Sequence, residues 1–321
     1  MHTLISTIPP ARYLPFTSGR YTTTPGLHSL TTDFGNGKAD QQIFQIDAHW
    51  PIYSENKRNC RRENINKYFK THQLKESTAR QLALFIIHQL LSEHPSVFSI
   101  EKRQKNNLFT NQLHQETLCF DQNYVLSGES NYVSILDALA SQVQEDMAVW
   151  QWDGETDWMA MIHLCAPNHW SPAEKIGKPF SAVHQPVAGM DKMRQRYQPM
   201  LKTLIRGGNF VRFAWGLSTD NRLNHHPEPA TDSNAALWHG RRFDPENPSL
   251  YVRVERQTLT GFPEANAVLF TIRTYFEQVS DLEYVHRNAL FSALNSMSPE
   301  TLEYKGLIED VEKITAYLQS F

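Results

Sequence analysis

Between residues 146 and 276 the chain contains five runs rich in β-branched and aromatic residues. These runs constrain the fold class more than any other feature of the sequence. The first two, MAVWQWD and WMAMIHLCAP, flank the turn-rich segment GETD and predict a β-hairpin. The other three are NFVRFAWGLS, SLYVRVERQTL and NAVLFTIRTYF. We expect these runs to form one mostly antiparallel, five-stranded sheet.

Apolar residues recur at helical spacing before these runs, between the second and third of them, and after the last. The helical segments are 77–94, 135–143, 191–204 and parts of 277–321. We therefore expect an α+β fold in which helices flank the sheet. Along the chain we expect an extended N-terminal arm (1–45), a helical N-terminal region (46–145), a core (146–276) and C-terminal helices (277–321).

Charge and cysteine content exclude several classes of protein. The 31 Lys and Arg residues nearly balance the 34 Asp and Glu residues, so no basic field is available to hold a nucleic acid. No apolar run approaches the roughly 18 to 20 residues that cross a bilayer, and the N-terminus shows no signal-peptide pattern. Three widely spaced cysteines, Cys60, Cys119 and Cys165, fit reduced thiols and predict a cytoplasmic protein.

The motifs for the commonest cofactors and hydrolytic reactions are missing. The sequence contains no GxGxxG and no GxxxxGK[ST], so we expect no NADPH or other nucleotide to bind this chain itself. HExxH, CxxC and GxSxG are absent as well, and three cysteines cannot supply the four ligands of an iron–sulfur cluster. Any electrons for redox chemistry must therefore come from another protein.

Three histidines have ordinary interpretations. His225 and His226 lie in the polar stretch NHHPEPATDSN, which predicts a solvated loop rather than a zinc site. His163 alternates with apolar residues in WMAMIHLCAP and is expected to be half-buried in a strand. A metal-ligand role for His163 is the second choice.

The segment SPAEKIGKPFSAVHQPVAG holds a fourth histidine between helix breakers. Ser171 can cap a short helical turn, and Pro186 forces the chain away from helix just after His184. One interpretation of His184 is an axial ligand to a heme iron. The other, which sequence physics alone favours, is a buried histidine that hydrogen-bonds to the backbone.

The run LYVRVERQTL carries three long polar residues on one face. Period-two alternation separates Val252 and Val254 from Arg253, Glu255 and Gln257. The polar face either meets solvent or lines an enclosed cavity. If it is enclosed, the arginine needs an anion and the glutamate needs a cation.

The segments WSPAEKIGKPFSAVHQPV and RVERQTLTGFPEANAVLFTIRTY resemble the signature of the heme-dependent oxidative N-demethylase alpha-subunit family. The resemblance runs from about IDAHWPIY to EYKGL, which is most of the chain. It implies a PAS-like core that binds heme b, without covalent attachment because the sequence has no CxxCH. It also implies oxidative demethylation of dimethylamine or another small secondary amine with O2, releasing formaldehyde.

The resemblance further implies roles for particular residues. His184 is the expected iron ligand, and Lys175 with Arg256 or Arg253 is expected to bind the heme propionates. Glu255 is expected to hold the substrate ammonium or to relay a proton to bound oxygen, with Arg253 beside it at the catalytic centre. A surface lysine is the alternative interpretation of Lys175.

Partner subunits are implied in the same way. In the family, flavin, an iron–sulfur cluster and tetrahydrofolate belong to separate subunits, so FMN, a 2Fe-2S cluster and NADPH are expected to act only through a reductase subunit, in a homo- or hetero-oligomer. The main alternative is a heme-based gas sensor or heme carrier of the same fold, although no output domain is recognisable in the sequence. The remaining alternative is a structural subunit that has lost its cofactor.

Overall fold

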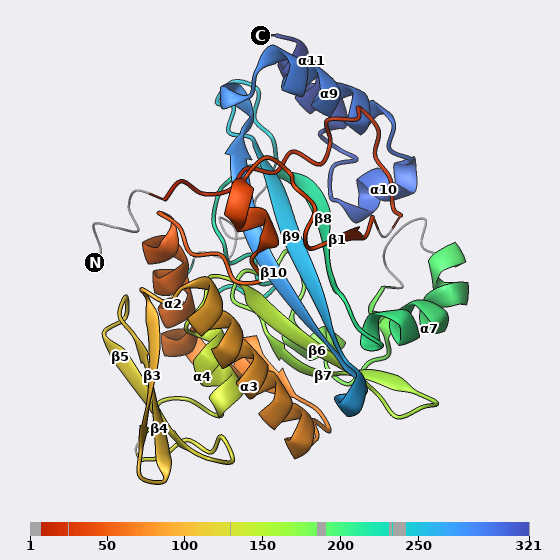
Figure 1. Ribbon diagram of the computed structural model, residues 1–321. Coiled ribbons are helices and arrows are strands. Elements are labelled where there is room, and N and C mark those ends of the chain that lie inside the picture. Colours follow the sequence, from red (N-terminus) through yellow and green to blue (C-terminus); the bar gives the residue numbers. More distant parts are fainter. Residues whose placement is uncertain are drawn as a thin grey trace.

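The computed structural model describes residues 8–24, 26–128, 130–184, 191–230, 233 and 242–320, and of 191–196 only the backbone. Its centre is an antiparallel seven-stranded sheet of order β1-β8-β9-β10-β6-β7-β2 (Figure 1). These strands are β1 (His28–Ser29), β2 (Phe69–Thr71), β6 (Asp146–Trp152), β7 (Asp157–His163), β8 (Asn209–Ser218), β9 (Tyr251–Phe262) and β10 (Ala267–Gln278). A second sheet of three strands has the order β3 (Phe98–Arg103), β4 (Asn106–Asn111), β5 (Glu116–Asp121).

Helices cover both faces of the large sheet. The described helices are α2 (Trp50–Tyr68), α3 (Glu76–Glu93), α4 (Ile135–Ala140), α5 (Pro172–Lys175), α6 (Phe180–Val183), α7 (Asp191–Ile205), α9 (Tyr284–Asn295), α10 (Pro299–Tyr304) and α11 (Val311–Gln319). Leu82 and Ile86 of α3 belong to the same apolar cluster as Val149 of β6, on what we call the α3 face. Val183 of α6 packs with Trp150 on the opposite α6 face. Figure 1 shows α3 and α7 on opposite sides of the sheet.

The helix α7 reaches the α6 face at a residue that has no side chain. A Cβ atom added to Gly261 of β9 would lie 2.0 Å from the carbonyl oxygen of Leu204, which is far inside van der Waals contact. Only glycine permits so close an approach of helix backbone to strand backbone. The glycine therefore sets where α7 covers the sheet.

The predicted strands and helices of the core are confirmed, with one extension of the sheet. β6 and β7 form the expected antiparallel hairpin, and β8, β9 and β10 occupy the three other predicted runs. The prediction of five strands was wrong, because β1 and β2 add short strands to the sheet, one at each edge. Two or three residues are too few to show an alternation in the sequence.

The region 46–145, which we expected to be helical, also contains the three-stranded sheet. Every residue of β3 after Phe98 is exposed, so this strand lacks the apolar alternation that marks a half-buried strand. The arm expected at 1–45 is mostly irregular, but it is anchored in the core, since Phe16 and Phe44 are fully buried. None of the described helices combines the length and apolar character needed to span a membrane.

Candidate functional site

Strand β9 directs a row of polar side chains onto the α6 face. Antiparallel pairing places Glu255 opposite Ala214 and Gln257 opposite Arg212, so these four residues share that face. The Arg253 side chain is only 2% exposed, and the Glu255 side chain keeps 16% exposure although strands flank β9 on both sides. The polar face is therefore largely enclosed, and solvent still reaches Glu255.

Arg256 points to the other side of the sheet. On the α3 face its guanidinium donates to the backbone carbonyls of Asp40, at 3.0 Å, and Gln42, at 2.7 Å. Its cross-strand neighbour Arg273 donates to the Gln45 carbonyl in the same segment. The structure therefore does not bring Arg256 together with Glu255. Instead, the hydrogen bonds of Arg256 attach the N-terminal segment to the sheet.

His184 follows α6 directly and has one defined hydrogen bond. Ser171 caps α5 as predicted, because its side chain accepts from the backbone N–H of Glu174. The Nδ1 atom of His184 lies 2.8 Å from the Phe180 carbonyl oxygen, and the two rings stack with centroids 4.0 Å apart. A carbonyl only accepts, so Nδ1 carries the hydrogen and Nε2 keeps its lone pair. Among the described residues none hydrogen-bonds to that Nε2.

The surroundings of His184 keep its ring neutral. Burial, together with the positive charges of Lys175 and Arg212, lowers the pKa of His184 to about 4 against the opposite effect of the Phe180 hydrogen bond. At neutral pH the imidazole therefore presents an unprotonated Nε2 at the edge of the α6 face. Both interpretations of this residue from the sequence agree with this geometry, because a backbone-bound histidine can also be a ligand.

Three cations from three different elements act on Glu255. They are Lys175 at the end of α5, Arg212 on β8 and Lys305 just after α10. Burial lowers the pKa of Lys175 and of Lys305 to about 8, although the Glu255 charge acts in the opposite direction on both. Arg253 also faces Glu255, but it interacts with Asp146 and Asp220 as well, and Glu174 acts on Lys175. Around Glu255 itself the cations outnumber the carboxylates, which favours an anionic ligand.

Two of these cations lack a hydrogen-bonded anion within the described ranges. The Nε atom of Arg212 is buried without a partner. The ammonium of Lys175 lies 3.6 Å from the centre of the Trp170 ring and makes no hydrogen bond to a described residue. Lys305 differs, because its ammonium donates to the Trp215 carbonyl at 2.6 Å. Arg212 and Lys175 are therefore the side chains best prepared to bind a carboxylate.

Hydrogen bonds fix the Arg253 side chain, and one of them goes to His225, which we expected to be solvated. Its guanidinium donates to the Ala166 carbonyl at 2.7 Å and to Nδ1 of His225 at 3.2 Å. The Nε2 atom of His225 in turn lies 2.7 Å from an Asp220 carboxylate oxygen. The prediction of a solvated loop was wrong, since His225 is 1% and His226 is 2% exposed. Sequence alone could not show that this polar loop folds over the end of the sheet.

His163 is fully buried at 1% exposure, rather than half-buried as predicted. It pairs with Met147 and so faces the α3 side, away from His184. Burial lowers the pKa of His163, but its contacts with Cys165 and the Asp137 carboxylate outweigh burial and raise the pKa to about 9. The structure therefore places His163 outside the polar face of β9.

Sequence reasoning missed Arg212 and Lys305. For Arg212 a signal was present, because it interrupts the apolar run NFVRFAWGLS in the same way that Arg253 and Glu255 interrupt the next strand. For Lys305 no signal exists, since its position depends on how the chain after α10 returns to β8. Of the residues predicted for the site, Lys175, His184, Arg253 and Glu255 share the α6 side of the sheet.

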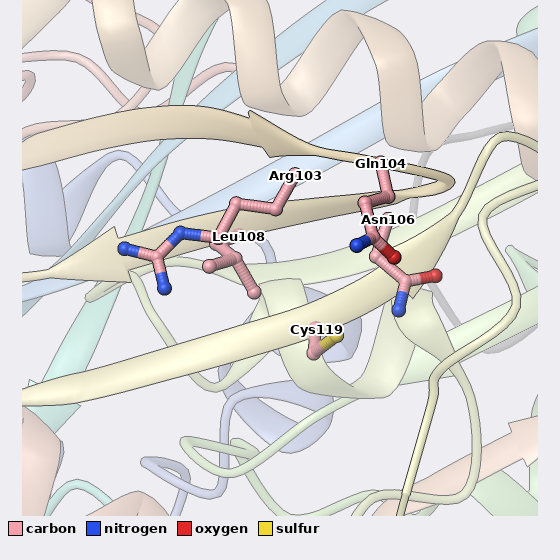
Figure 2. Close-up of a pocket in the computed structure, with 5 residues that line it drawn as sticks. All are labelled: Arg103, Gln104, Asn106, Leu108 and Cys119. Atoms are coloured by element: carbon pink, nitrogen blue, oxygen red, sulfur yellow. The ribbon is translucent and has the colours of Figure 1, made fainter.

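A surface hollow of about 590 Å³ lies elsewhere, on the three-stranded sheet. Figure 2 shows its lining, which consists of Arg103, Gln104, Asn106, Leu108 and Cys119. None of these residues belongs to the polar face of β9, and the hollow contains no carboxylate or imidazole. Its one thiol, Cys119, lies in the separate three-stranded sheet and so adds nothing to the candidate site.

Comparison with known protein families gives one match. A family described as haem-dependent oxidative N-demethylase, alpha subunit-like, matches residues 36–315. The matched segment includes every residue of the polar face and His184. The match confirms the resemblance seen in the sequence.

Proposed function

Because the chain belongs to the haem-dependent oxidative N-demethylase alpha subunit-like family, we propose that it binds heme b on the α6 face and acts as the oxygenase component of an N-demethylase. The observation that carries this proposal is a neutral histidine with a fixed Nδ1 hydrogen bond beside a surplus of buried cations. The proposed heme-binding core is the region 146–276, with a PAS-like arrangement of its strands.

The residues on this face fit an iron porphyrin in two respects. A histidine that ligates iron does so as a neutral imidazole, and its other nitrogen is usually held by a carbonyl or carboxylate. His184 meets both conditions through Phe180. Two propionates require cationic donors, and Lys175 and Arg212 have no other described acceptor. In this proposal Arg212 takes the propionate-binding role that the family resemblance implied for Arg256 or Arg253.

The proposed division of labour follows from the charges. When bound, heme iron supplies the redox chemistry that activates O2. Arg253 orients Glu255, because its guanidinium lies 3.7 Å from the Glu255 carboxylate and is itself fixed by Ala166 and His225. Glu255 accepts a hydrogen bond from Gln257 and retains solvent contact. Once the propionates offset the surrounding cations, its carboxylate can attract the ammonium of a small secondary amine or pass a proton to the solvent side.

Electrons must be delivered from outside this chain. An alpha subunit implies further subunits, and the sequence has no nucleotide or iron–sulfur motif. We propose that a partner reductase carrying FMN and a 2Fe-2S cluster transfers electrons from NADPH. The three free cysteines support a cytoplasmic location for this complex.

A reconstitution of turnover tests the proposal. The purified heme-loaded protein is mixed with NADPH and a flavin/iron–sulfur reductase, and dimethylamine or another short secondary amine is added. We expect amine-dependent formaldehyde release and no NADPH oxidation when the reductase is omitted. If heme binds and its ferrous form takes up carbon monoxide, yet no amine yields aldehyde with any competent reductase, the demethylase proposal fails and a gas-binding protein replaces it.

A further inference from the structure

A second cluster of polar side chains lies between α2 and the ends of β6 and β7, and the heme proposal does not use it. Asp146, His163 and Cys165 each present one ligand atom, these atoms lie within 4.8 Å of one another, and all three residues are buried. Cys60 of α2 approaches from the helix side. Its sulfur lies 3.7 Å from the Cys165 carbonyl oxygen, and it acts electrostatically on the Cys165 thiol.

The spacing of these atoms is close to that of a tetrahedral metal site. The Cys165 sulfur lies 3.9 Å from Nδ1 of His163. Around a zinc ion with Zn–S of about 2.3 Å and Zn–N of about 2.0 Å, the same two atoms would be about 3.5 Å apart. The Asp146 carboxylate is oriented by the backbone N–H groups of Cys165 and Ala166, at 2.8 and 2.7 Å. This pair needs to contract by only a few tenths of an ångström, the other pairs among the three ligand atoms by up to about an ångström, and Cys60 must move closer to complete the site.

The surroundings of the other ring nitrogen of His163, Nε2, also favour a metal site. Its Nε2 lies 3.4 Å from an Asp137 carboxylate oxygen and makes no hydrogen bond within the described part of the chain. Asp137 is held in turn by Arg61. A carboxylate behind the imidazole is the usual arrangement for a histidine that binds a metal through its other nitrogen.

The charges around the cluster balance when a divalent ion is present. Two thiolates and one carboxylate with Zn²⁺ sum to −1. The buried ammonium of Lys57, which donates to the carbonyls of Ala140 and Glu145, interacts with Asp146 and both cysteines and supplies the compensating positive charge. The four ligands, the zinc ion and Lys57 therefore sum to zero charge, which lowers the cost of burying the site.

We propose that Cys60, Asp146, His163 and Cys165 bind one zinc ion in a closed structural site that joins α2 to β6 and β7. Binding breaks two S–H bonds and the Nδ1–H bond of the protonated His163, and it forms two Zn–S bonds, one Zn–N bond and one Zn–O bond. The displaced protons go to solvent, and no electrons are transferred. Because all four ligands are buried, the ion enters while the chain folds.

The test is the metal content and the zinc K-edge X-ray absorption of the full chain, produced in zinc-supplemented medium under reducing conditions. We expect about one zinc per chain, with two sulfur atoms at about 2.3 Å and two nitrogen or oxygen atoms in the first shell. The heme iron does not interfere at the zinc edge. The variant Cys119→Ser, in the separate three-stranded sheet, should keep the metal and this spectrum.

Two variants sharpen the result. Cys165→Ser should reduce zinc content at least tenfold, and Cys60→Ser should leave one sulfur in the shell of any remaining zinc. The wild-type measurement decides the matter even if these variants do not fold. Zinc below about a tenth of an equivalent in the wild type, or a bound zinc whose shell contains no sulfur, would overturn the proposal without affecting the heme assignment.

Discussion

At the scale of single residues, protonation decides what the α6 face can bind. The His184 pKa of about 4 lies below the ordinary value of 6.5, so a proton competes for Nε2 only in acid. The lysine pKa values of about 8 lie below their ordinary 10.5, so Lys175 and Lys305 lose charge when the pH rises above 8. An iron ligand needs the neutral imidazole, and propionates need the charged ammonium groups.

Heme affinity should therefore be greatest between about pH 5 and pH 8. Below pH 5 protonation of His184 weakens binding, and above pH 8 deprotonation of the two lysines weakens it. Heme titrations followed by absorbance across this range measure the effect. An affinity that begins to fall at pH 6.5, where an ordinary histidine titrates, would contradict the assigned environment of His184.

Arg212 offers a matched test of the anion site. Arg212→Met keeps most of the side-chain volume but removes the charge, and it should weaken heme binding at least tenfold, because a charge-assisted hydrogen bond contributes about 1.5 to 3 kcal/mol. Arg206→Met is the control, since Arg206 is exposed and lies just beyond α7. Equal heme affinity in the two variants would remove Arg212 from the site.

At the scale of elements, the two faces of β9 are expected to have different roles: side chains on the α3 face contribute to stability, and side chains on the α6 face contribute to activity. Val254 is fully buried on the α3 face, so Val254→Ala should lower the free energy of unfolding by about 2 kcal/mol through lost burial and a cavity. Glu255→Gln keeps the shape of the opposite face and should impair amine-dependent turnover instead. Thermal unfolding and formaldehyde release measure the two effects. If Glu255→Gln keeps full activity, Glu255 does not act on the substrate.

Local patterns predicted these elements where burial is regular along the chain. The helix α3 shows its apolar stripe, and β9 shows its alternation, because one face of each packs on a core. The strand β3 shows neither, since almost all of it is exposed. Arg256 lies on the face opposite Glu255, as period-two alternation requires, whereas the family resemblance implied both for one site.

At the scale of the whole molecule, the candidate site depends on contacts that no local pattern contains. The cations around Glu255 come from α5, β8 and the chain after α10. Two of them, Lys175 and Lys305, are more than 120 residues apart in sequence. The burial of His225 likewise depends on a loop that folds back over β9. Sequence therefore predicted the histidine and the carboxylate, and only the assembled fold adds Arg212 and Lys305.

The central claim is that His184 binds the heme iron, and resonance Raman spectroscopy of the ferrous protein tests it most directly. The wild type should show an iron–histidine stretching band, His184→Gly should lose it, and added imidazole should restore it by occupying the space of the missing ring. The same treatment of His88→Ala, at an exposed position on α3, should leave the band unchanged, because α3 packs on the other face of the sheet. A His184→Gly protein that retains heme and the wild-type band without imidazole would contradict the account.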